Sequence, residues 1–325
     1  MKAIVYHDYG SPDVLRCEEL EKPTPGDDEV LIKVRAASVN PYDWRVMRGR
    51  PFFIRLMMGG LRKPKETRLG RDAAGQVEAV GRNVTRFKPG DEVFGACPGA
   101  FAEYVCTVEE RLALKPANVS FEDAAAVPIA ALTALQGLRD QGRIRRSQKV
   151  LIDGASGGVG TFAVQIAKSF GAEVTAVCST RNLEQARSIG ADHAIDYTRE
   201  DFTKSGQRYD VIFAANGYHS VFDYRRALSQ DGIYVMVGGG WAQMIQTMLL
   251  GPLLSRIGSR KSCFGAASII QKDLVLLKDL LEAGTIVSVI DRRYPFSEVA
   301  EAVRYLEEGH ARGKVVITFD HGTGT

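Results

Sequence analysis

The chain has 325 residues, which is enough for two domains that each bury a core of their own. Its 42 Lys and Arg and 39 Asp and Glu leave a net charge of +3, which gives no reason to expect a nucleic-acid partner. The first ten residues, MKAIVYHDYG, lack the apolar core of a signal peptide. The five cysteines form no C-x-x-C pair, so we expect free thiols and a cytoplasmic location.

Short apolar runs separated by turn residues make up the first 120 residues. Four of them are KAIVY at 2–6, EVLIKVRAA at 29–37, AAGQVEAVG at 73–81 and DEVFGAC at 91–97. Turn sequences such as PTPGDD and FKPGD lie between the runs. This pattern predicts an antiparallel, barrel-like β domain rather than strands that alternate with helices.

A different pattern begins near residue 122. EDAAAVPIAALTALQGL has helical apolar spacing, with Ser120 as its predicted N-cap. Strand-like runs then alternate with helical stretches, beginning with VLIDG at 150–154 and the helix at 159–171. Further buried strands are predicted at 174–178, 193–197, 210–215 and 233–239. The alternation predicts a doubly wound parallel sheet. Two helices and a final strand, KVVITF, are predicted after residue 268.

The segment GASGGVG at 154–160 is the strongest functional signal. Gly154, Gly157 and Gly160 are spaced three residues apart, directly after a predicted strand and at the start of a predicted helix. Such glycines permit a tight turn and a close approach of the backbone to a pyrophosphate. The helix N-terminus then offers unpaired N–H groups and a positive dipole end to the anion. The segment therefore predicts a dinucleotide site.

The end of the next strand favours NADPH over NADH. An NAD site usually has an acidic residue about 20 residues after the glycines. Here that position reads Cys178–Ser179–Thr180–Arg181, and the first acid is Glu184. Hydroxyls and a guanidinium suit a 2′-phosphate, although Arg181 alone is also compatible with a solvated loop. Tyr197, at the end of the following strand, is either a second phosphate contact or a packing residue.

Several motifs together resemble a known family. They are ASVNPYD at 37–43, LGRDAAG at 69–75, GAFAEYV at 99–105, AAAVPIAALTAL at 124–135, the segment at 150–168, GADHAIDY at 190–197 and GHARGKVVI at 309–317. Their order resembles the medium-chain dehydrogenase/reductase superfamily. Within it the chain is similar to the zinc-free quinone oxidoreductase branch, including reticulon-interacting mitochondrial and chloroplast-envelope proteins. The likeness extends from residue 1 to about residue 319.

The resemblance implies an α/β fold and a set of cofactor contacts. It implies a GroES-like β-barrel domain at 1–125, completed by 268–325, a Rossmann domain at 126–267, and a homodimer. The pyrophosphate would contact Ser156, Gly157, Gly158 and Val159, and the 2′-phosphate would contact Ser179, Arg181 and Tyr197. Asn216, Gly238 and Gly239 would follow the ribose and nicotinamide, and His310, Ala311 and Arg312 would cover the cofactor from the other domain. Ala214–Ala215 departs from the family, which commonly has an acid there.

The zinc ligands of related alcohol dehydrogenases are replaced in this chain. Asn40 and Gly70–Arg71–Asp72 stand where those enzymes have a cysteine and Gly-His-Glu. Zinc prefers thiolate and imidazole ligands, so we expect no metal. For Arg71–Asp72 we prefer the interpretation of a structural ion pair.

Without a metal, hydride transfer suits an electron-poor acceptor, a small quinone or an α,β-unsaturated carbonyl compound. Asn40 is the first candidate for the hydrogen-bond donor to the acceptor oxygen, with Thr133 or Tyr42 assisting, or with solvent supplying the proton. For Asp43 we prefer a role in ordering the loop after Asn40, with a catalytic role as the alternative. Two alternatives stay open: an NADPH-binding regulatory or scaffold protein with vestigial activity, and a zinc-dependent alcohol dehydrogenase.

The apolar segment 241–260 follows the second pair of glycines. A wall for a hydrophobic substrate and a plain buried helix or subunit contact are equally compatible with it. A peripheral membrane contact is a weaker alternative, suggested by Arg256, Arg260 and Lys261 after the apolar run.

Overall fold

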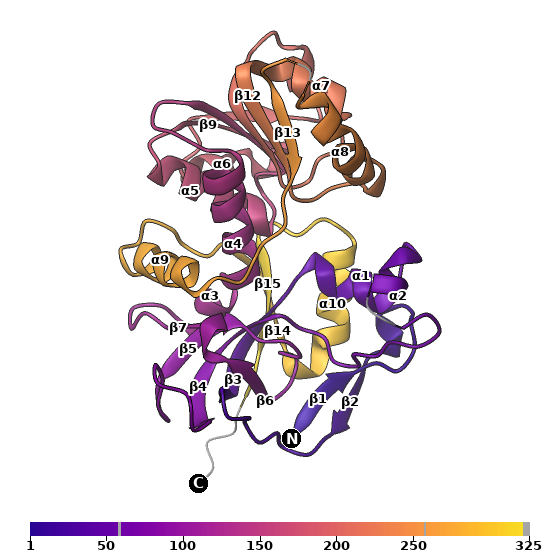
Figure 1. Ribbon diagram of the computed structural model, residues 1–325, viewed down its shortest axis with the longest axis vertical. Helices are drawn as coiled ribbons and strands as arrows, with labels where there is room; N and C mark the ends of the chain where they lie inside the picture. Colours follow the sequence, from indigo (N-terminus) through magenta and orange to yellow (C-terminus); the bar gives the residue numbers. More distant parts are fainter. Residues whose placement is uncertain (58–59, 257, 321–325) are drawn as a thin grey trace. The chain divides into compact units, whose positions relative to one another are not determined.

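The computed structural model describes residues 1–57, 60–256 and 258–320, and the chain divides into two compact units (Figure 1). Unit 1 comprises residues 1–129, 269–284 and the segment from 288 onward, and unit 2 comprises residues 130–268 and 285–287. The sequence predicts divisions at 125/126 and 267/268. The short return to unit 2 has a clear cause, because the Gln165 side chain bonds both the N–H and the carbonyl of Val287, at 2.8 and 3.0 Å.

Unit 1 is built around a sheet of the order β14-β15-β3-β4-β5-β7, with β6 paired to β3. Its strands in the described chain are β3 (Glu29–Val39), β4 (Asp72–Val80), β5 (Glu92–Ala96), β6 (Tyr104–Val108), β7 (Leu112–Leu114), β14 (Ile290–Pro295) and β15 (Lys314–Thr318). β1 (Lys2–Val5) and β2 (Arg16–Glu19) form a separate antiparallel pair. Its helices are α1 (Pro41–Arg48), α2 (Phe53–Met57), α3 (Phe121–Ala125), α9 (Gln271–Glu282) and α10 (Val299–Glu307).

The pairing in unit 1 is antiparallel, as the sequence predicts, except between β14 and β15. These two strands are parallel because α10 lies between them in the chain and forms a crossover. The long strand β3 is central, with eight of its eleven residues buried.

Unit 2 contains a parallel sheet of the order β10-β9-β8-β11-β12-β13. Its strands are β8 (Lys149–Asp153), β9 (Glu173–Cys178), β10 (His193–Asp196), β11 (Tyr209–Ala214), β12 (Leu228–Met236) and β13 (Lys261–Phe264), and its helices include α5 (Gly158–Ser169), α6 (Leu183–Ser188), α7 (Val221–Ala227) and α8 (Trp241–Leu254). The order reverses between β8 and β11. Ligands of doubly wound sheets bind at such a reversal, beside the carboxyl ends of the strands, and the glycine segment follows β8. The predicted α/β architecture is confirmed.

Two predicted segments differ from the structure. The predicted helix after Ser120 is divided at Pro128, giving α3 and α4 (Pro128–Gln136), and a π-helical turn follows at Gly137–Gln141. Proline disfavours helical geometry in the residue before it and removes one N–H donor, which explains the division. The residues after Asn40, expected to be a loop, form helix α1. There the Asp43 carboxylate accepts a 2.7 Å bond from the Asn40 N–H and caps the first turn.

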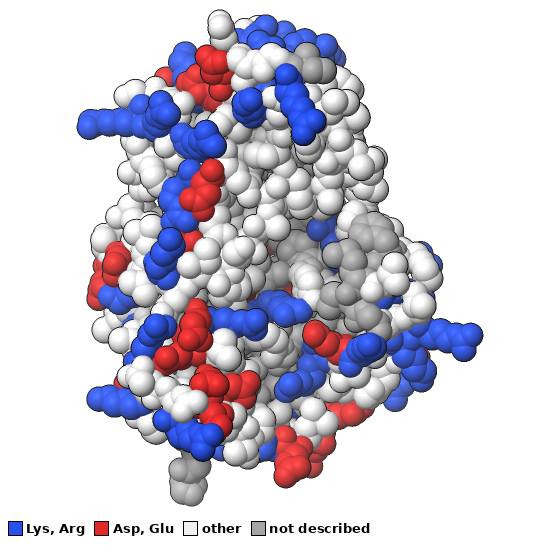
Figure 2. Space-filling model, viewed as in Figure 1, with Lys and Arg blue, Asp and Glu red and all other residues white. Residues whose placement is uncertain are grey.

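Helix α8 carries much of the apolar segment noted in the sequence. Its outward side is exposed, with Leu249 71% and Met248 55% exposed, while Met244 is buried in the core of unit 2. Ile257, part of the same segment, lies outside the described residues. Among the described residues, the helices are too short or too polar to cross a membrane. Over much of the face shown in Figure 2, Lys and Arg lie beside Asp and Glu, in keeping with the small net charge.

Candidate functional site

The glycine segment forms a tight turn between β8 and α5. Gly154 has φ = +80°, which favours glycine. A Cβ on Gly160 would lie 2.1 Å from the Gly154 carbonyl oxygen, so this close approach of helix and strand also requires glycine. Gly157 is the N-cap of α5 and contributes no side chain to its first amides. The first turn of α5 carries no acidic residue, so it can receive an anion.

Asp153, the last residue of β8, stabilises the glycine turn through hydrogen bonds of its backbone and side chain. Its backbone carbonyl accepts bonds from the N–H groups of Ala215 and Asn216, at 2.9 and 3.3 Å. Its carboxylate is buried and accepts a hydrogen bond from the Tyr224 hydroxyl. Burial raises the pKa of Asp153 to about 6, against the lowering effect of that bond. The structure thus brings Asn216 beside Gly154, where a Cβ on Gly154 would meet the Asn216 Cβ at 2.6 Å.

Gly238 and Gly239 lie beside the same strand end. The Gly217 N–H donates to the Gly238 carbonyl at 3.0 Å, and Gly217 and Gly239 form an isolated β-bridge. A Cβ on Gly238 would lie 2.4 Å from the Ala215 carbonyl oxygen. The ends of β8, β11 and β12 thus meet in unit 2, and a glycine or asparagine lies within two residues after each strand.

The expected 2′-phosphate residues lie at the ends of β9 and β10. Ser179 follows β9, Arg181 is exposed, and Tyr197 after β10 is 60% exposed. An unexpected residue, Asn182, joins this region to the glycine turn. Its Nδ2 donates to the Ser156 Oγ at 3.0 Å and to the Ser179 Oγ at 3.2 Å. In the sequence Asn182 is indistinguishable from an ordinary helix N-cap, a position that it also occupies before α6.

A second unexpected residue is the acid Asp196. It comes from the end of β10, so counting along the chain from the glycines does not reveal it. Its carboxylate accepts bonds from the hydroxyls of Thr180 and Thr198, and Arg199 lies 3.4 Å away. The bond from Thr180 is the main cause that lowers the pKa of Asp196. The acid is thus already engaged by donors of the protein.

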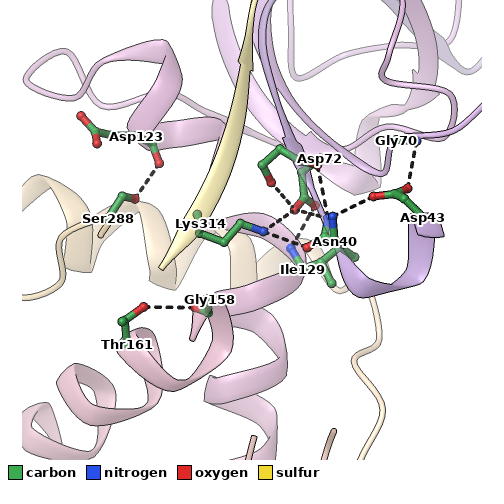
Figure 3. A network of polar contacts seen from close by, with 11 residues as sticks. Asn40, Asp43, Gly70, Asp72, Asp123, Ile129, Gly158, Thr161, Ser288 and Lys314 are labelled. Carbon is green, nitrogen blue, oxygen red and sulfur yellow. Dashed lines mark hydrogen bonds and ion pairs between the residues drawn. The ribbon is translucent and has the colours of Figure 1, made fainter. Parts of the chain in front are cut away.

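A buried polar network lies in unit 1, where β3, β4 and β15 adjoin (Figure 3). Asn40 is 3% exposed, and both ends of its amide are engaged. Its Nδ2 donates to the Asp72 Oδ2 at 2.9 Å, and its Oδ1 accepts from the Lys314 Nζ at 2.8 Å. The Lys314 Nζ is also 3.6 Å from the Asp72 Oδ2. The Ser38 hydroxyl donates to the same carboxylate at 2.9 Å.

Burial shifts the charges of this network. It raises the pKa of Asp43 to about 6, although the carboxylate accepts bonds from the Asn40 and Gly70 N–H groups. It raises the pKa of Asp72, opposed by Lys314, and lowers the pKa of Lys314, opposed by Asp72. Lys314 thus forms an ion pair with Asp72 and acts on Asp43 only through its charge. The expected Arg71–Asp72 ion pair is wrong, because Lys314 pairs with Asp72 while Arg71 contacts Tyr42 and Glu66.

The network does not have the composition of a zinc site. Zinc is usually held by thiolate and imidazole groups, whereas this network offers two carboxylates, an amide and a lysine. Among the described residues, three or more His, Cys, Asp or Glu side chains do not gather in a way that could hold a metal ion.

The remaining predicted residues lie in different places. Tyr42, on α1, is partly buried, accepts a hydrogen bond from Arg71, and has the Arg71 guanidinium 4.5 Å from its ring centroid. Burial raises the pKa of Tyr42 and Arg71 opposes the shift. Thr133 lies on α4 and is partly buried. His310, Ala311 and Arg312 lie between α10 and β15, where the Arg312 N–H donates to Asp291 at 2.9 Å.

Two family models match the chain. The model described as alcohol dehydrogenase GroES-like domain matches residues 26–117, and the model described as zinc-binding dehydrogenase matches residues 189–317.

Curated relatives match along nearly the whole chain. The chain is 37% identical to the 2-methylene-furan-3-one reductase of Solanum lycopersicum and 36% identical to the chloroplastic NADPH-dependent alkenal/one oxidoreductase of Arabidopsis thaliana. Each alignment covers 98% of this chain and 79% of the relative. It is 35% identical to a mitochondrial NAD(P)H oxidoreductase of Mus musculus, over 98% of this chain and 89% of that one.

Solved structures of quinone oxidoreductases have a similar fold. The quinone oxidoreductase from Coxiella burnetii has a TM-score of 0.85 and 30% identity, covering 98% of this chain and 99% of that chain. The Escherichia coli quinone oxidoreductase, solved in complex with NADPH, has a TM-score of 0.82 and 26% identity, covering 98% and 100%.

The expected cytoplasmic location is contradicted by these comparisons. Relatives that match 98% of the chain are named as chloroplastic or mitochondrial proteins. The expectation rested in part on the cysteines, and free thiols are equally compatible with the reducing interior of an organelle. The composition therefore does not distinguish these compartments.

Proposed function

Because the chain belongs to the medium-chain dehydrogenase/reductase superfamily, among its quinone and alkenal/one oxidoreductases, we propose that it reduces enones or quinones with NADPH and without zinc. An oxidoreductase of this type and NADPH as its cofactor follow from the relatives. What we propose beyond this is that the reduction does not require zinc and that the acceptor is an enone or a quinone. The observation that carries it is the replacement of a metal-ligand set by the Asn40–Asp72–Lys314 network.

The geometry of unit 2 fits the cofactor. The first turn of α5 is suited to a pyrophosphate, and a Cβ on Gly157 would meet only the Gly154 oxygen, at 3.7 Å, so the backbone there borders open space. We propose pyrophosphate contacts at 156–159 and 2′-phosphate contacts at Ser179, Arg181 and Tyr197. The ribose and nicotinamide contacts are proposed at Asn216, Gly238 and Gly239. His310, Ala311 and Arg312 are further proposed contacts, and a homodimer is proposed from the family resemblance.

When bound, NADPH supplies a hydride for the electron-poor carbon of the acceptor. The oxygen of the acceptor then gains negative charge and requires a hydrogen-bond donor. Asn40 has its amide engaged by Asp72 and Lys314, so we assign it a positioning role. Tyr42 becomes the first candidate donor, because a phenol whose oxygen accepts a bond from a guanidinium is a stronger donor. Thr133 remains the assisting candidate.

The test is the oxidation of NADPH against a panel of ortho-quinones, para-quinones, enones and simple alcohols or ketones, with NADH in parallel. We expect turnover with quinones or enones and a kcat/KM at least tenfold higher with NADPH than with NADH. Tight NADPH binding without turnover on any of these would support a regulatory or scaffold protein instead.

A further inference from the structure

Asn182 lies between two side chains that the proposed function assigns to different phosphates of NADPH. It is 4% exposed, and its side-chain nitrogen is within hydrogen-bond distance of both Ser156, in the glycine turn, and Ser179, after β9. Its carbonyl oxygen Oδ1 is buried and has no hydrogen-bond partner among the described residues. A buried polar atom without a partner is rare and calls for an explanation.

The orientation of this amide follows from its neighbours. An asparagine nitrogen carries two hydrogens, and here each is directed to one serine oxygen. If the amide were rotated by half a turn, Nδ2 and Oδ1 would exchange places. Both N–H hydrogens would then be buried at the position where Oδ1 now lies without a partner. That arrangement would leave two donors unsatisfied instead of one acceptor, at a higher cost.

The orientation has a consequence for the two hydroxyls. A serine oxygen that accepts a bond from Asn182 keeps its own hydrogen for another acceptor. The phosphate groups of NADPH are strong acceptors, and bonds to charged acceptors are the stronger ones. Each hydroxyl is therefore oriented in the way that a phosphate requires before the cofactor binds.

We propose that Asn182 is a positioning residue of the NADPH site, whose amide orients Ser156 toward the pyrophosphate and Ser179 toward the 2′-phosphate as hydrogen-bond donors. The buried Oδ1 holds this orientation of the amide, because the reversed amide would bury two N–H hydrogens there. This inference rests on the proposed placement of NADPH at these two serines. It assigns Asn182 a share in the preference for NADPH, because Ser179 faces the group that NADH lacks.

The test is the dissociation constant of NADPH and of NADH, measured by nicotinamide fluorescence for the wild type, Asn182→Ala, Ser156→Ala, Ser179→Ala and the double variant Asn182→Ala/Ser179→Ala. Loss of charge-assisted bonds predicts that Asn182→Ala weakens NADPH binding about tenfold and NADH binding about threefold. The fold-loss of NADPH affinity in the double variant should be smaller than the product of the fold-losses in the two single variants, because Asn182 acts through Ser179. Asn118→Ala is the matched control: this asparagine bonds the Glu282 carbonyl in unit 1, and its loss should leave both constants unchanged.

Asn182→Asp keeps the shape of the side chain but has only acceptors in its ionised form, so it reverses the direction of both serine hydroxyls. We expect it to weaken NADPH binding more than Asn182→Ala does, and this variant serves if Asn182→Ala fails to fold. Wild-type affinity for NADPH in both Asn182 variants would overturn the inference. So would a double variant whose fold-loss of NADPH affinity equals the product of the two single fold-losses. If Ser156→Ala and Ser179→Ala leave NADPH binding unchanged, the proposed placement of the cofactor fails instead.

Discussion

Asp153 links the core of unit 2 to the glycine turn. Its carboxylate accepts a hydrogen bond from the Tyr224 hydroxyl. The Tyr224 ring stacks on the Tyr234 ring, with centroids 4.4 Å apart. Its backbone carbonyl receives the two N–H groups at the end of β11. The acid thus supports the glycine turn structurally, although its sequence position, one residue before Gly154, gives no sign of a buried carboxylate.

The burial of Asp153 predicts a pH dependence of stability. Its folded pKa is about 6, above the usual 3.8, so the folded state binds the proton more tightly than the unfolded state. The stabilisation is fully present below about pH 4 and is lost as the pH rises through about 6. Asp153→Asn removes this titration. We expect its unfolding free energy, relative to wild type, to rise between pH 4 and about pH 7 by about 2–3 kcal/mol.

Urea denaturation at several pH values measures this difference. Asp210→Asn, a change at a partly exposed acid on the same sheet, is the matched control. A difference between wild type and Asp153→Asn that does not change with pH would contradict the prediction.

The buried polar network of unit 1 joins residues that are far apart in the sequence. Asn40 and Lys314 lie 274 positions apart, yet their side chains are in contact. The motifs around each are recognisable by resemblance, but no local pattern predicts that a lysine ammonium pairs with Asp72. For the same reason the sequence assigns Arg71 as the partner of Asp72, because the two are neighbours in the chain.

At the scale of elements, β8, the glycine turn and α5 are the part of the site that the sequence predicts best. Their signals are local: a buried apolar run, glycines three residues apart and a helical apolar face. Strands β2 and β14 were not predicted. β2 and β14 are mostly exposed or half-buried, so they lack the apolar alternation that marks a strand.

Two glycines of the turn have different roles, and substitution by alanine separates them. At Gly160 a Cβ would clash with the Gly154 backbone at 2.1 Å, so we expect Gly160→Ala to destabilise the protein by about 1–3 kcal/mol. At Gly157 the Cβ has room and φ is −83°, so Gly157→Ala should keep stability within about 0.5 kcal/mol. It should still weaken NADPH binding at least tenfold, because the added methyl occupies the border where the pyrophosphate is proposed to approach.

Thermal unfolding and NADPH titration of the two variants check this pair. Wild-type NADPH affinity in Gly157→Ala would contradict the placement of the pyrophosphate at this turn.

At the scale of the whole molecule, the two units contribute different chemistry to the proposed reaction. Unit 2 provides a parallel sheet whose strand order reverses at the glycine turn, and this is the arrangement that fits a dinucleotide. Unit 1 provides a sheet in which Asn40 and Asp72, at positions that the resemblance matches to zinc ligands of alcohol dehydrogenases, contact the buried Lys314. The alternation of strands and helices predicts a division of this kind, and the relatives align with 98% of the chain.

Reduction without zinc is tested by the rate of NADPH oxidation with an enone or quinone after prolonged dialysis against a metal chelator. The metal content of the same sample is measured alongside. We predict less than about 0.1 zinc per chain and a kcat/KM equal to that of untreated protein, since the Asn40–Asp72–Lys314 network has the wrong ligands for zinc. About one zinc per chain before dialysis, with activity lost on its removal and restored by adding zinc, would contradict the account.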